Sequence, residues 1–382
     1  MKEGAFSLQN RELYYLTKKE KNTKARLGEL RLAHGVVQTP VFMPVGTIGT
    51  VKTMSSIEMA KIGYELILNN TLHLFLRPGL DIIKEFKGIK NMIRWNKNLL
   101  TDSGGYQVFS LSDFRHINDD GVIFKDPMTG SKHFFNPEIV IDIQKIIGSD
   151  IIMPLDECTP TSVDKSYSKI AKDRTTRWAK RSRDYIKTIE DPPFLFGITQ
   201  GNMYEDLRKE SILELVDLDF DGYSIGGLSV GENKEIMYSI TDISTAILPE
   251  NKARYLMGVG SPEDLVETVG LGIDMFDCVM PTRNARNGSV FTHFGKMNLI
   301  NAKHKTSQLP IEEGCPCFAC QNYSRGYIRH LFKTREMLGY QLATVHNLTY
   351  IFNLMKEIRK AIEEDRYPMF KKKFYELYFH KE

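Results

Sequence analysis

Five short apolar stretches of this chain each run directly into a polar residue or a pair of glycines. They are NLLT before Asp102, IIMPL before Asp156, FLFGIT before Gln200, DGYSI before Gly226-Gly227 and GIDMF before Asp277. Parallel α/β barrels place their catalytic side chains on the loops that follow the C-terminal ends of the strands. The pattern therefore indicates one reaction centre assembled from distant parts of the chain.

Asp102 and Asp277 are the candidate catalytic acids. Glycosyl transfer through a covalent intermediate uses two carboxylates, one that attacks the anomeric carbon and one that carries protons. Two plainer explanations exist. Asp102 precedes Gly104-Gly105, as turn residues do, and Asp277 lies in an apolar run, as a buried hydrogen-bonded acid would. An unpaired buried carboxylate is costly, so Asp277 needs a specific reason for its position, but the pattern alone leaves both explanations open.

Asp156, Gln200 and the glycine pair at 226–227 are suited to reading a purine. Guanine offers N1–H and N2–H donors to a carboxylate and its O6 oxygen to an amide, and glycine lets the backbone approach a flat ring. Tyr106 and Met257 could sandwich that ring by stacking. Each residue also has an ordinary explanation, a strand-end turn for the glycines and core packing for Met257, so none of these signals is specific alone.

Three of the five cysteines form the compact motif Cys315-Pro-Cys317-Phe-Ala-Cys320. Cysteines this close favour a metal over disulfides, and a tetrahedral zinc needs one further ligand. Spacing does not choose among the histidines at 293, 304, 330 and 346. Three thiolates and an imidazole leave no open position, so the expected zinc is structural. Cys158 and Cys278 lie in the expected strands and are interpreted as ordinary buried thiols.

Composition and charge narrow the class of protein. The 382 residues are 42% hydrophobic and 26% charged, as in ordinary globular proteins. The first residues have no apolar core of signal-peptide length, and no apolar run approaches the ~18 residues that span a bilayer, so we expect a cytoplasmic protein without a membrane partner. Residues 281–346 carry nine Lys and Arg against three Asp and Glu, although the whole chain has a net charge of only +3. This local excess predicts a phosphate-backbone partner rather than a merely solvated basic face.

Eight apolar runs must position these residues. They cover 40–46, 65–71, 98–104, 149–156, 193–200, 220–227, 253–260 and 272–279. Helix starts lie between them, with Asn136-Pro137-Glu138 and Ser261-Pro262-Glu263 as cap-and-proline signals. Eight strands alternating with helices predict a (β/α)8 barrel of the TIM type, with an inserted zinc-binding subdomain near the C-terminus.

The expected organisation has three parts. Residues 1–282 form the barrel, with a hairpin insertion at about 105–135 that turns at Met128-Thr129-Gly130. Residues 283–346 form the basic zinc-binding insertion. Residues 347–382 are helices that complete the barrel and the zinc subdomain, the first of them starting near Asn347.

Longer motifs point to a family. The segments that carry the resemblance are DSGGYQVFSL (102–111), LDEC (155–158), FGITQGN (196–202), DGYSIGGLSVGE (221–232), YLMGVG (255–260), GIDMFDCVMPTRNARNG (272–288) and CPCFAC followed by His346. They closely resemble the tRNA-guanine transglycosylases, also called queuine tRNA-ribosyltransferases. The resemblance runs from about residue 41 to the helix after His346, and its motifs are long and specific.

The resemblance implies a zinc-containing (β/α)8 homodimer that exchanges guanine at the tRNA wobble position for a 7-deazaguanine, in queuosine biosynthesis. It implies no nucleotide cofactor. The tRNA partner would be the anticodon loop of GUN-type tRNAs, and the target base would have to leave its stack. Asp277 would attack the ribose C1′ and Asp102 would act as general acid and base.

The resemblance also assigns the binding residues. The base would be bound by Asp156, Gln200, Gly227 and the Leu228 carbonyl, between Tyr106 and Met257. The zinc ligands would be Cys315, Cys317, Cys320 and His346, and the anticodon loop would be held by Arg283 and Arg286.

Several positions depart from the family pattern, and two others differ between bacterial-type members and the rest of the family. The departures are Asn69, Leu72, Thr161-Ser162, Ser224 and Ser229. Val230 and Cys158 resemble the bacterial type, which favours 7-aminomethyl-7-deazaguanine over the bulkier queuine. Asp156 and the Leu228 carbonyl would suit the ammonium group of that base.

Rival interpretations make different predictions. A non-catalytic tRNA-binding barrel subunit would lack one or both acids, yet Asp102 and Asp277 are present. A carbohydrate glycosidase would carry aromatic sugar platforms and no basic segment at 281–346. An archaeal-type transglycosylase acting on the D-loop would carry a further RNA-binding domain, for which the length leaves no room. The same reaction with queuine as substrate remains the nearest alternative.

Overall fold

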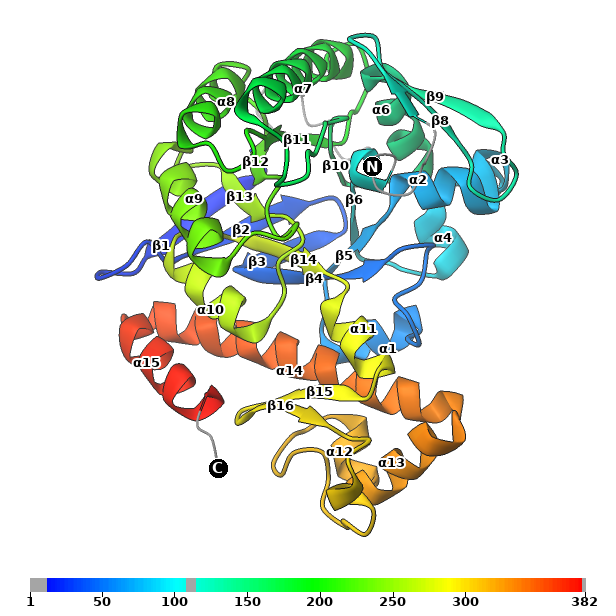
Figure 1. Ribbon diagram of the computed structural model, residues 1–382, viewed down its shortest axis with the longest axis vertical. Helices are drawn as coiled ribbons and strands as arrows, with labels where there is room; N and C mark the ends of the chain where they lie inside the picture. The colour runs from blue at the N-terminus through cyan, green and yellow to red at the C-terminus, as the bar shows by residue number, and fades with distance from the viewer. Residues whose placement is uncertain (1–11, 108–114, 380–382) are drawn as a thin grey trace, which may run out of the picture.

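Eight parallel strands form a closed barrel in the computed structural model, which describes residues 12–107 and 115–379 (Figure 1). Around the barrel these strands are β4 (Val41–Gly46), β5 (Leu66–Asn69), β6 (Asn98–Thr101), β10 (Ile151–Ile152), β11 (Phe194–Thr199), β12 (Gly222–Ile225), β13 (Ala253–Leu256) and β14 (Met275–Cys278), which pairs with β4. The predicted (β/α)8 fold is confirmed. Residues 108–111 of the DSGGYQVFSL motif lie outside the described residues.

Burial on both faces explains why these strands are continuously apolar. Residues that point into the barrel, such as Phe196, Ile198 and Tyr255, pack in one interior cluster. Their neighbours along the same strands, such as Leu195 and Leu256, pack in the cluster between the sheet and the helices. Side chains therefore fill the barrel, and chemistry is left to its rim.

Helices cover the outside of the barrel (Figure 1). They are α1 (Ser56–Ile62), α2 (Thr71–Leu74), a π-type turn (Phe75–Gly79), α3 (Leu80–Glu85), α4 (Ile89–Ile93), α6 (Pro137–Ile147), α7 (Lys165–Ile186), α8 (Glu205–Asp217), α9 (Lys234–Ile247) and α10 (Pro262–Gly270). Both predicted helix starts are confirmed, since the Asn136 side chain accepts from the Ile139 N–H and the Ser261 hydroxyl accepts from the Asp264 N–H.

An antiparallel sheet that the sequence did not predict closes the N-terminal end of the barrel. It consists of β1 (Tyr14–Lys19), β2 (Arg26–Leu32) and β3 (Gly35–Thr39). Tyr14 packs with the interior cluster and donates its hydroxyl to Asp274 at 3.1 Å. The Arg26 guanidinium also donates to Asp274, at 2.9 Å. Because this end is sealed, the C-terminal rim is the open end of the barrel in the part of the chain that the structure describes.

The expected hairpin insertion is a three-stranded sheet. It contains β7 (Arg115–Ile117), β8 (Val122–Lys125) and β9 (Lys132–Phe135), where only the last two strands were expected. The predicted turn is confirmed, because the Asp126 carboxylate accepts from the Met128 N–H and Gly130 has a φ of 73°. The side chain of Asp126 thus fixes the tip of the hairpin.

The C-terminal part packs against one side of the barrel (Figure 1). It comprises α11 (Met280–Arg286), β15 (Ser289–Thr292), β16 (Gly295–Asn298), a 3-10 turn (Ala302–His304), α12 (Phe318–Asn322), α13 (Arg325–Thr334), α14 (Met337–Glu363) and α15 (Tyr367–Tyr378). Helix α14 lies between the barrel and the hairpin of β15 and β16. In the described part of the chain, no helix combines the length and apolarity needed to cross a bilayer.

The expected start of the long C-terminal helix near Asn347 is wrong. Helix α14 begins ten residues earlier, at Met337. Its first turns are already apolar on the buried side, where Leu342 and Val345 join the core, so no break occurs before His346. The division between 346 and 347 therefore falls inside a helix, and the three-part organisation of the chain stays a prediction.

Candidate active site and metal centre

The residues expected at the site end or follow neighbouring strands at the C-terminal rim. In order around the barrel, Asp102 follows β6, Asp156 follows β10, Gln200 follows β11, Gly226-Gly227 follow β12, Met257 follows β13 and Asp277 lies in β14. All eight strands are parallel, so these residues come together at one end. Only β4 and β5 separate β14 from β6.

Asp102 is held by a cluster of donors. Its Oδ1 accepts from the Thr71 N–H at 3.0 Å and the Gly104 N–H at 3.1 Å, and the Asn70 amide donates to Oδ2. Burial raises the pKa of this carboxyl to about 7 against these hydrogen bonds, and the charge of Asp277 raises it further. Two acids close enough to interact thus share the rim, and one of them titrates near neutral pH.

Asp277 is held asymmetrically. The Tyr255 hydroxyl donates to Oδ1 at 2.5 Å, and the Gly258 N–H donates to the same oxygen at 2.8 Å. Within the described residues, Oδ2 accepts no hydrogen bond. Burial raises the pKa of Asp277, while the hydrogen bond from Tyr255 lowers it. One oxygen is therefore anchored and the other is left for a reaction partner.

Asp156 and Gln200 lie in direct contact. The Gln200 amide donates to Asp156 Oδ2 at 2.8 Å, and the Ser103 hydroxyl donates to Oδ1 at 3.0 Å. Burial raises the pKa of Asp156 to about 6, and the neighbouring charge of Glu157 raises it as well. The Asp156 carboxylate and the Gln200 amide thus have fixed orientations at the C-terminal rim of the barrel.

The glycine pair is required by a close approach of Gln200. A Cβ on Gly226 would lie 2.8 Å from Gln200 Nε2, and one on Gly227 would lie 2.5 Å from Gln200 Oε1. Gly227 also has a φ of 65°. Any side chain at either position would displace the amide that contacts Asp156.

The remaining residues expected to bind the base differ in exposure. Tyr106 is 51% exposed in a helical turn after β6, and Met257 is partly buried against the barrel interior. Leu228 is buried and is followed by Ser229, which has a positive φ. The Glu232 carboxylate accepts from the N–H groups of Ser229 and Val230, which fixes the loop that carries Leu228.

Arg283 and Arg286 lie on α11, the helix that begins three residues after Asp277. Arg283 is exposed. Arg286 is half-buried and donates to the Thr282 carbonyl at 3.1 Å. Both cations therefore lie near the rim that carries the two acids.

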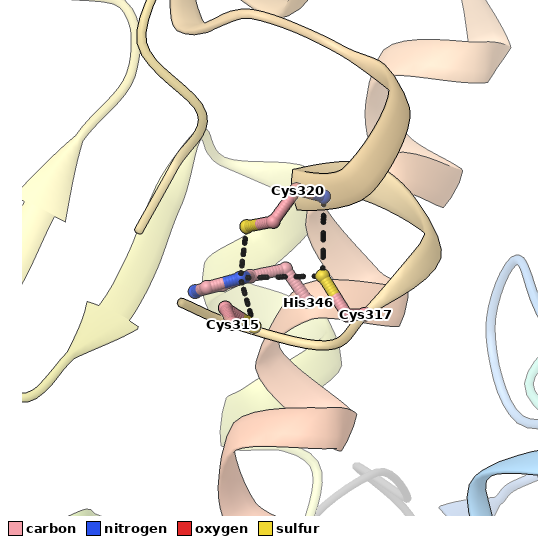
Figure 2. Close-up of side chains that lie close together, drawn as sticks. All are labelled: Cys315, Cys317, Cys320 and His346. Carbon is pink, nitrogen blue, oxygen red and sulfur yellow. Dashed lines mark hydrogen bonds between the residues drawn. The ribbon is translucent and has the colours of Figure 1, made fainter. Parts of the chain in front are cut away.

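Three thiols and one imidazole form the candidate metal centre (Figure 2). The Sγ atoms of Cys315, Cys317 and Cys320 lie 3.7, 3.6 and 3.3 Å from Nδ1 of His346. The Nε2–H of His346 donates to the Phe291 carbonyl at 2.7 Å, so Nδ1 carries the free lone pair that a metal requires. The four buried ligand atoms lie within 4.8 Å of one another, and the donor set fits a tetrahedral zinc.

The helical turn that supplies His346 also ties the centre to the barrel. The Asn347 amide donates to the carbonyls of Pro281 and Ser289 at 2.9 and 3.1 Å, and its oxygen accepts from the Phe291 N–H at 3.0 Å. Asn347 therefore joins the candidate metal centre to the start of α11.

Comparison with known proteins now decides the family. The family model described as queuine tRNA-ribosyltransferase matches residues 20–380. The queuine tRNA-ribosyltransferase of Thermoanaerobacter sp. (strain X514) is 54% identical over 369 residues, which cover 97% of this chain and 98% of the relative. Those of Chromobacterium violaceum and Neisseria meningitidis serogroup C are 53% and 51% identical, and cover 92% and 94% of this chain and 94% and 96% of the relatives.

The chain belongs to the queuine tRNA-ribosyltransferase family. The resemblance recognised in the motifs is thereby confirmed, together with the expectation of a pentosyltransferase.

The departures from the family pattern fall into two groups. Three are buried: Asn69, whose amide can donate to the Gly46 carbonyl at 2.8 Å, Leu72, which packs against Gly104, and Ser224. The other three, Thr161, Ser162 and Ser229, are exposed. The three buried departures therefore affect packing beneath the rim of the barrel, and only the three exposed ones change its solvent-facing surface.

Sequence reasoning missed Tyr255 and Asn70, which hold the two acids. Tyr255 precedes Met257 by two residues, so strand alternation points both side chains into the barrel. That alternation was the available signal for Tyr255. Asn70 gave no such signal. Its side chain accepts from the His73 N–H and caps α2, and an Asn before a helix is fully explained by that capping role.

Proposed function

We propose that this protein is a tRNA-guanine transglycosylase that exchanges guanine at the wobble position for 7-aminomethyl-7-deazaguanine, as a step in queuosine biosynthesis. The observation that carries the proposal is the pairing of two interacting acids at one rim. Asp277 keeps an oxygen without a hydrogen bond from the described residues, and Asp102 has a pKa of about 7.

In the first half-reaction, Oδ2 of Asp277 attacks the ribose C1′ of the target nucleotide. The bond from C1′ to N9 breaks, its electron pair leaves with guanine, and Asp102 supplies the proton. Tyr255 and the Gly258 N–H hold Oδ1 and fix the angle of attack. The product is a covalent ester between Asp277 and the tRNA.

In the second half-reaction, the incoming base attacks the same C1′. Asp102, now ionised, accepts the N9 proton, N9 forms the new glycosidic bond, and Asp277 leaves as a carboxylate. A group that titrates near pH 7 serves well in both directions of proton transfer.

Asp156 and Gln200 read the base. The Asp156 carboxylate accepts from N1–H and the 2-amino group, which a purine without these donors cannot match. Gln200 and the Gly227 N–H would donate to O6, and Tyr106 and Met257 would cover the two faces of the ring. The Leu228 carbonyl receives the ammonium group of 7-aminomethyl-7-deazaguanine. The bacterial-type residues Val230 and Cys158 support this base over queuine.

The metal centre and the basic segment hold the tRNA. Cys315, Cys317, Cys320 and His346 would bind one structural zinc per subunit, which orders residues 283–346. Arg283 and Arg286 would contact the phosphates of the anticodon loop of GUN-type tRNAs after the target base has left its stack. We further propose a cytoplasmic homodimer; a molar mass of one subunit by light scattering at micromolar concentration would contradict the dimer.

An exchange assay tests the function. Radiolabelled guanine, unmodified tRNA and the protein should give label in the tRNA without ATP or added magnesium. Competition between 7-aminomethyl-7-deazaguanine and queuine then identifies the incoming base, and stronger competition by queuine would favour the alternative substrate. Absence of any incorporation with a GUN-type tRNA would reject the transglycosylase proposal.

A further inference from the structure

We propose that Arg208 is a positioning residue for base recognition. Its guanidinium orients the Gly226-Gly227 peptide and thereby aims the Gly227 N–H at the 6-oxo group of the base. This inference rests on the proposed function and deepens it.

Arg208 is a fully buried cation on α8 whose hydrogen bonds within the described residues all go to backbone carbonyls. Its Nε donates to Asn202 at 2.7 Å, one terminal nitrogen donates to Gly226 at 2.6 Å and Thr199 at 3.3 Å, and the other donates to Gly227 at 3.2 Å. In the same part of the chain, no carboxylate forms a salt bridge with it. Burial lowers its pKa to about 10, so the side chain remains charged at neutral pH.

The four acceptors flank the residues that read the base. Thr199 and Asn202 lie on either side of Gln200 and Gly201, and the two glycine carbonyls belong to the loop that leads into Leu228. The same helix also anchors Gln200 directly, because the Ser211 hydroxyl accepts the Gln200 N–H at 3.1 Å. One helix thus fixes both recognition loops with respect to each other.

The geometry of the peptide bond lets the hydrogen bond from Arg208 to the Gly226 carbonyl set the direction of the Gly227 N–H. A trans peptide is planar, and its C=O and N–H bonds point in opposite directions. Because Arg208 draws the Gly226 carbonyl toward α8, the Gly227 N–H must point away from that helix. It faces the thiol of Cys158, whose pKa it lowers against the larger effect of burial. Cys158 lies two residues after Asp156 on the segment that follows β10, so the Gly227 N–H lies beside the segment that carries Asp156.

The chemistry of arginine suits this task. Its planar guanidinium carries five N–H donors in a fixed fork, whereas glutamine carries two and lysine has no planar fork. Neither replacement can satisfy four carbonyls in two loops at once. A released Gly226 carbonyl would let the peptide rotate, and the donor to O6 would be lost.

Base analogues separate positioning from stability. We would measure inhibition of labelled-guanine incorporation by unlabelled guanine and by 6-thioguanine, in which a weak sulfur acceptor replaces O6. The wild-type protein should bind guanine more tightly than 6-thioguanine. In Arg208→Gln, the inhibition constant of guanine should rise about tenfold, while that of 6-thioguanine changes little, because only guanine loses a hydrogen bond. Arg208→Lys should give an intermediate ratio.

Arg254 provides a matched control at the other end of the barrel. It is 5% exposed, donates to the Leu248 carbonyl at 2.7 Å, and burial lowers its pKa to about 10 as well. Arg254→Gln should lower the Tm but keep the wild-type ratio of the two inhibition constants. The ratio does not depend on the folded fraction, since both bases are measured on one preparation.

Three outcomes would overturn the inference without affecting the proposed function. They are a wild-type ratio in Arg208→Gln, an equal change of the ratio in Arg254→Gln, and failure of every Arg208 variant to fold, which would make Arg208 a residue of fold stability. Failure of the wild-type protein to incorporate guanine would instead reject the proposed function itself.

Discussion

The hydroxyl of Tyr255 lies 2.5 Å from Oδ1 of Asp277 and leaves Oδ2 of that carboxylate without a hydrogen bond from the described residues. Tyr255 is buried and Asp277 is half-buried at the rim of the barrel, where a hydrogen bond to a charged group is stronger than in water. In the proposed mechanism, the Tyr255 hydroxyl therefore orients the oxygen of Asp277 that attacks, although Tyr255 itself does not react.

Tyr255→Phe should lower kcat about tenfold and leave the KM for tRNA nearly unchanged, because the hydroxyl acts on the orientation of Asp277 and not on tRNA binding. Steady-state exchange kinetics measure both constants. Tyr64→Phe is the control, since it removes another buried hydroxyl, which donates to the Leu348 carbonyl away from the rim. Equal loss of kcat in the two variants would show that the effect is only structural.

Asp277→Ala should abolish both base exchange and the covalent complex with tRNA, because no other described group supplies the attacking oxygen in this mechanism. Denaturing gel electrophoresis of enzyme mixed with tRNA detects the complex. Asp102→Asn should still form some complex but exchange bases at least ~100-fold more slowly, as expected when a general acid and base is lost. A complex that survives in Asp277→Ala would reassign the nucleophile.

The pH dependence of the second half-reaction should follow Asp102. This carboxyl must be ionised to accept the N9 proton. Its pKa is about 7 while Asp277 is charged, and the esterified Asp277 no longer raises it, so the rate should increase with pH with a midpoint no higher than about 7. This step is measured by adding guanine to the isolated covalent complex and following the release of tRNA from the protein in a single turnover. The dependence should disappear in Asp102→Asn, and its persistence there would assign the titration to another group.

Asp156 should make the folded protein less stable as pH rises. Its pKa is raised to about 6 in the folded state from the ordinary aspartate value of 3.8, so the folded state binds the proton more tightly than the unfolded chain does. The resulting stabilisation is present at low pH and is lost as pH rises through 6. Asp156→Asn should therefore raise the Tm by roughly 2–4 °C at pH 8, and by less at pH 4.5. Calorimetry at the two pH values checks this; an increase that is the same at both would exclude ionisation as the cause.

Cys317→Ser should lose the bound metal and loosen residues 283–346, because a tetrahedral site with one thiolate missing binds zinc far more weakly. Elemental analysis gives the zinc content, and limited proteolysis reports on the segment. Cys158→Ser, which changes a thiol remote from the centre, should keep full zinc content. Unchanged zinc in Cys317→Ser would reject the ligand assignment.

Strand ends and motifs made most of the site predictable from the sequence. Asp102, Asp156, Gln200 and Asp277 each follow or end an apolar run, and parallel strands necessarily bring such positions to one rim. The fourth ligand of the metal centre was different. Spacing left four histidines open, and only the resemblance singled out His346, which the structure places against the three thiols.

The parts that were not predicted depend on contacts between segments distant in sequence. The sheet of β1 to β3 alternates only weakly in polarity, and its function as a plug follows from Tyr14 and Arg26 meeting Asp274, which lies 260 and 248 residues further along the chain. Arg208 gave no sequence signal either, since a single arginine on an amphipathic helix is ordinarily a surface residue. Only the fold shows that this side chain is enclosed by four carbonyls.

The adjacency of His346 and Asn347 would link the metal content of the centre to the rate of the proposed exchange. The His346 side chain lies in the thiol cluster, and the Asn347 amide donates to the carbonyl of Pro281, four residues beyond Asp277. Removal of a metal ion from this centre would loosen that helical turn and, with it, the anchor of the segment that follows Asp277, the proposed nucleophile. A chelator should thus slow the proposed exchange, although none of the four candidate ligands is expected to contact ribose or purine.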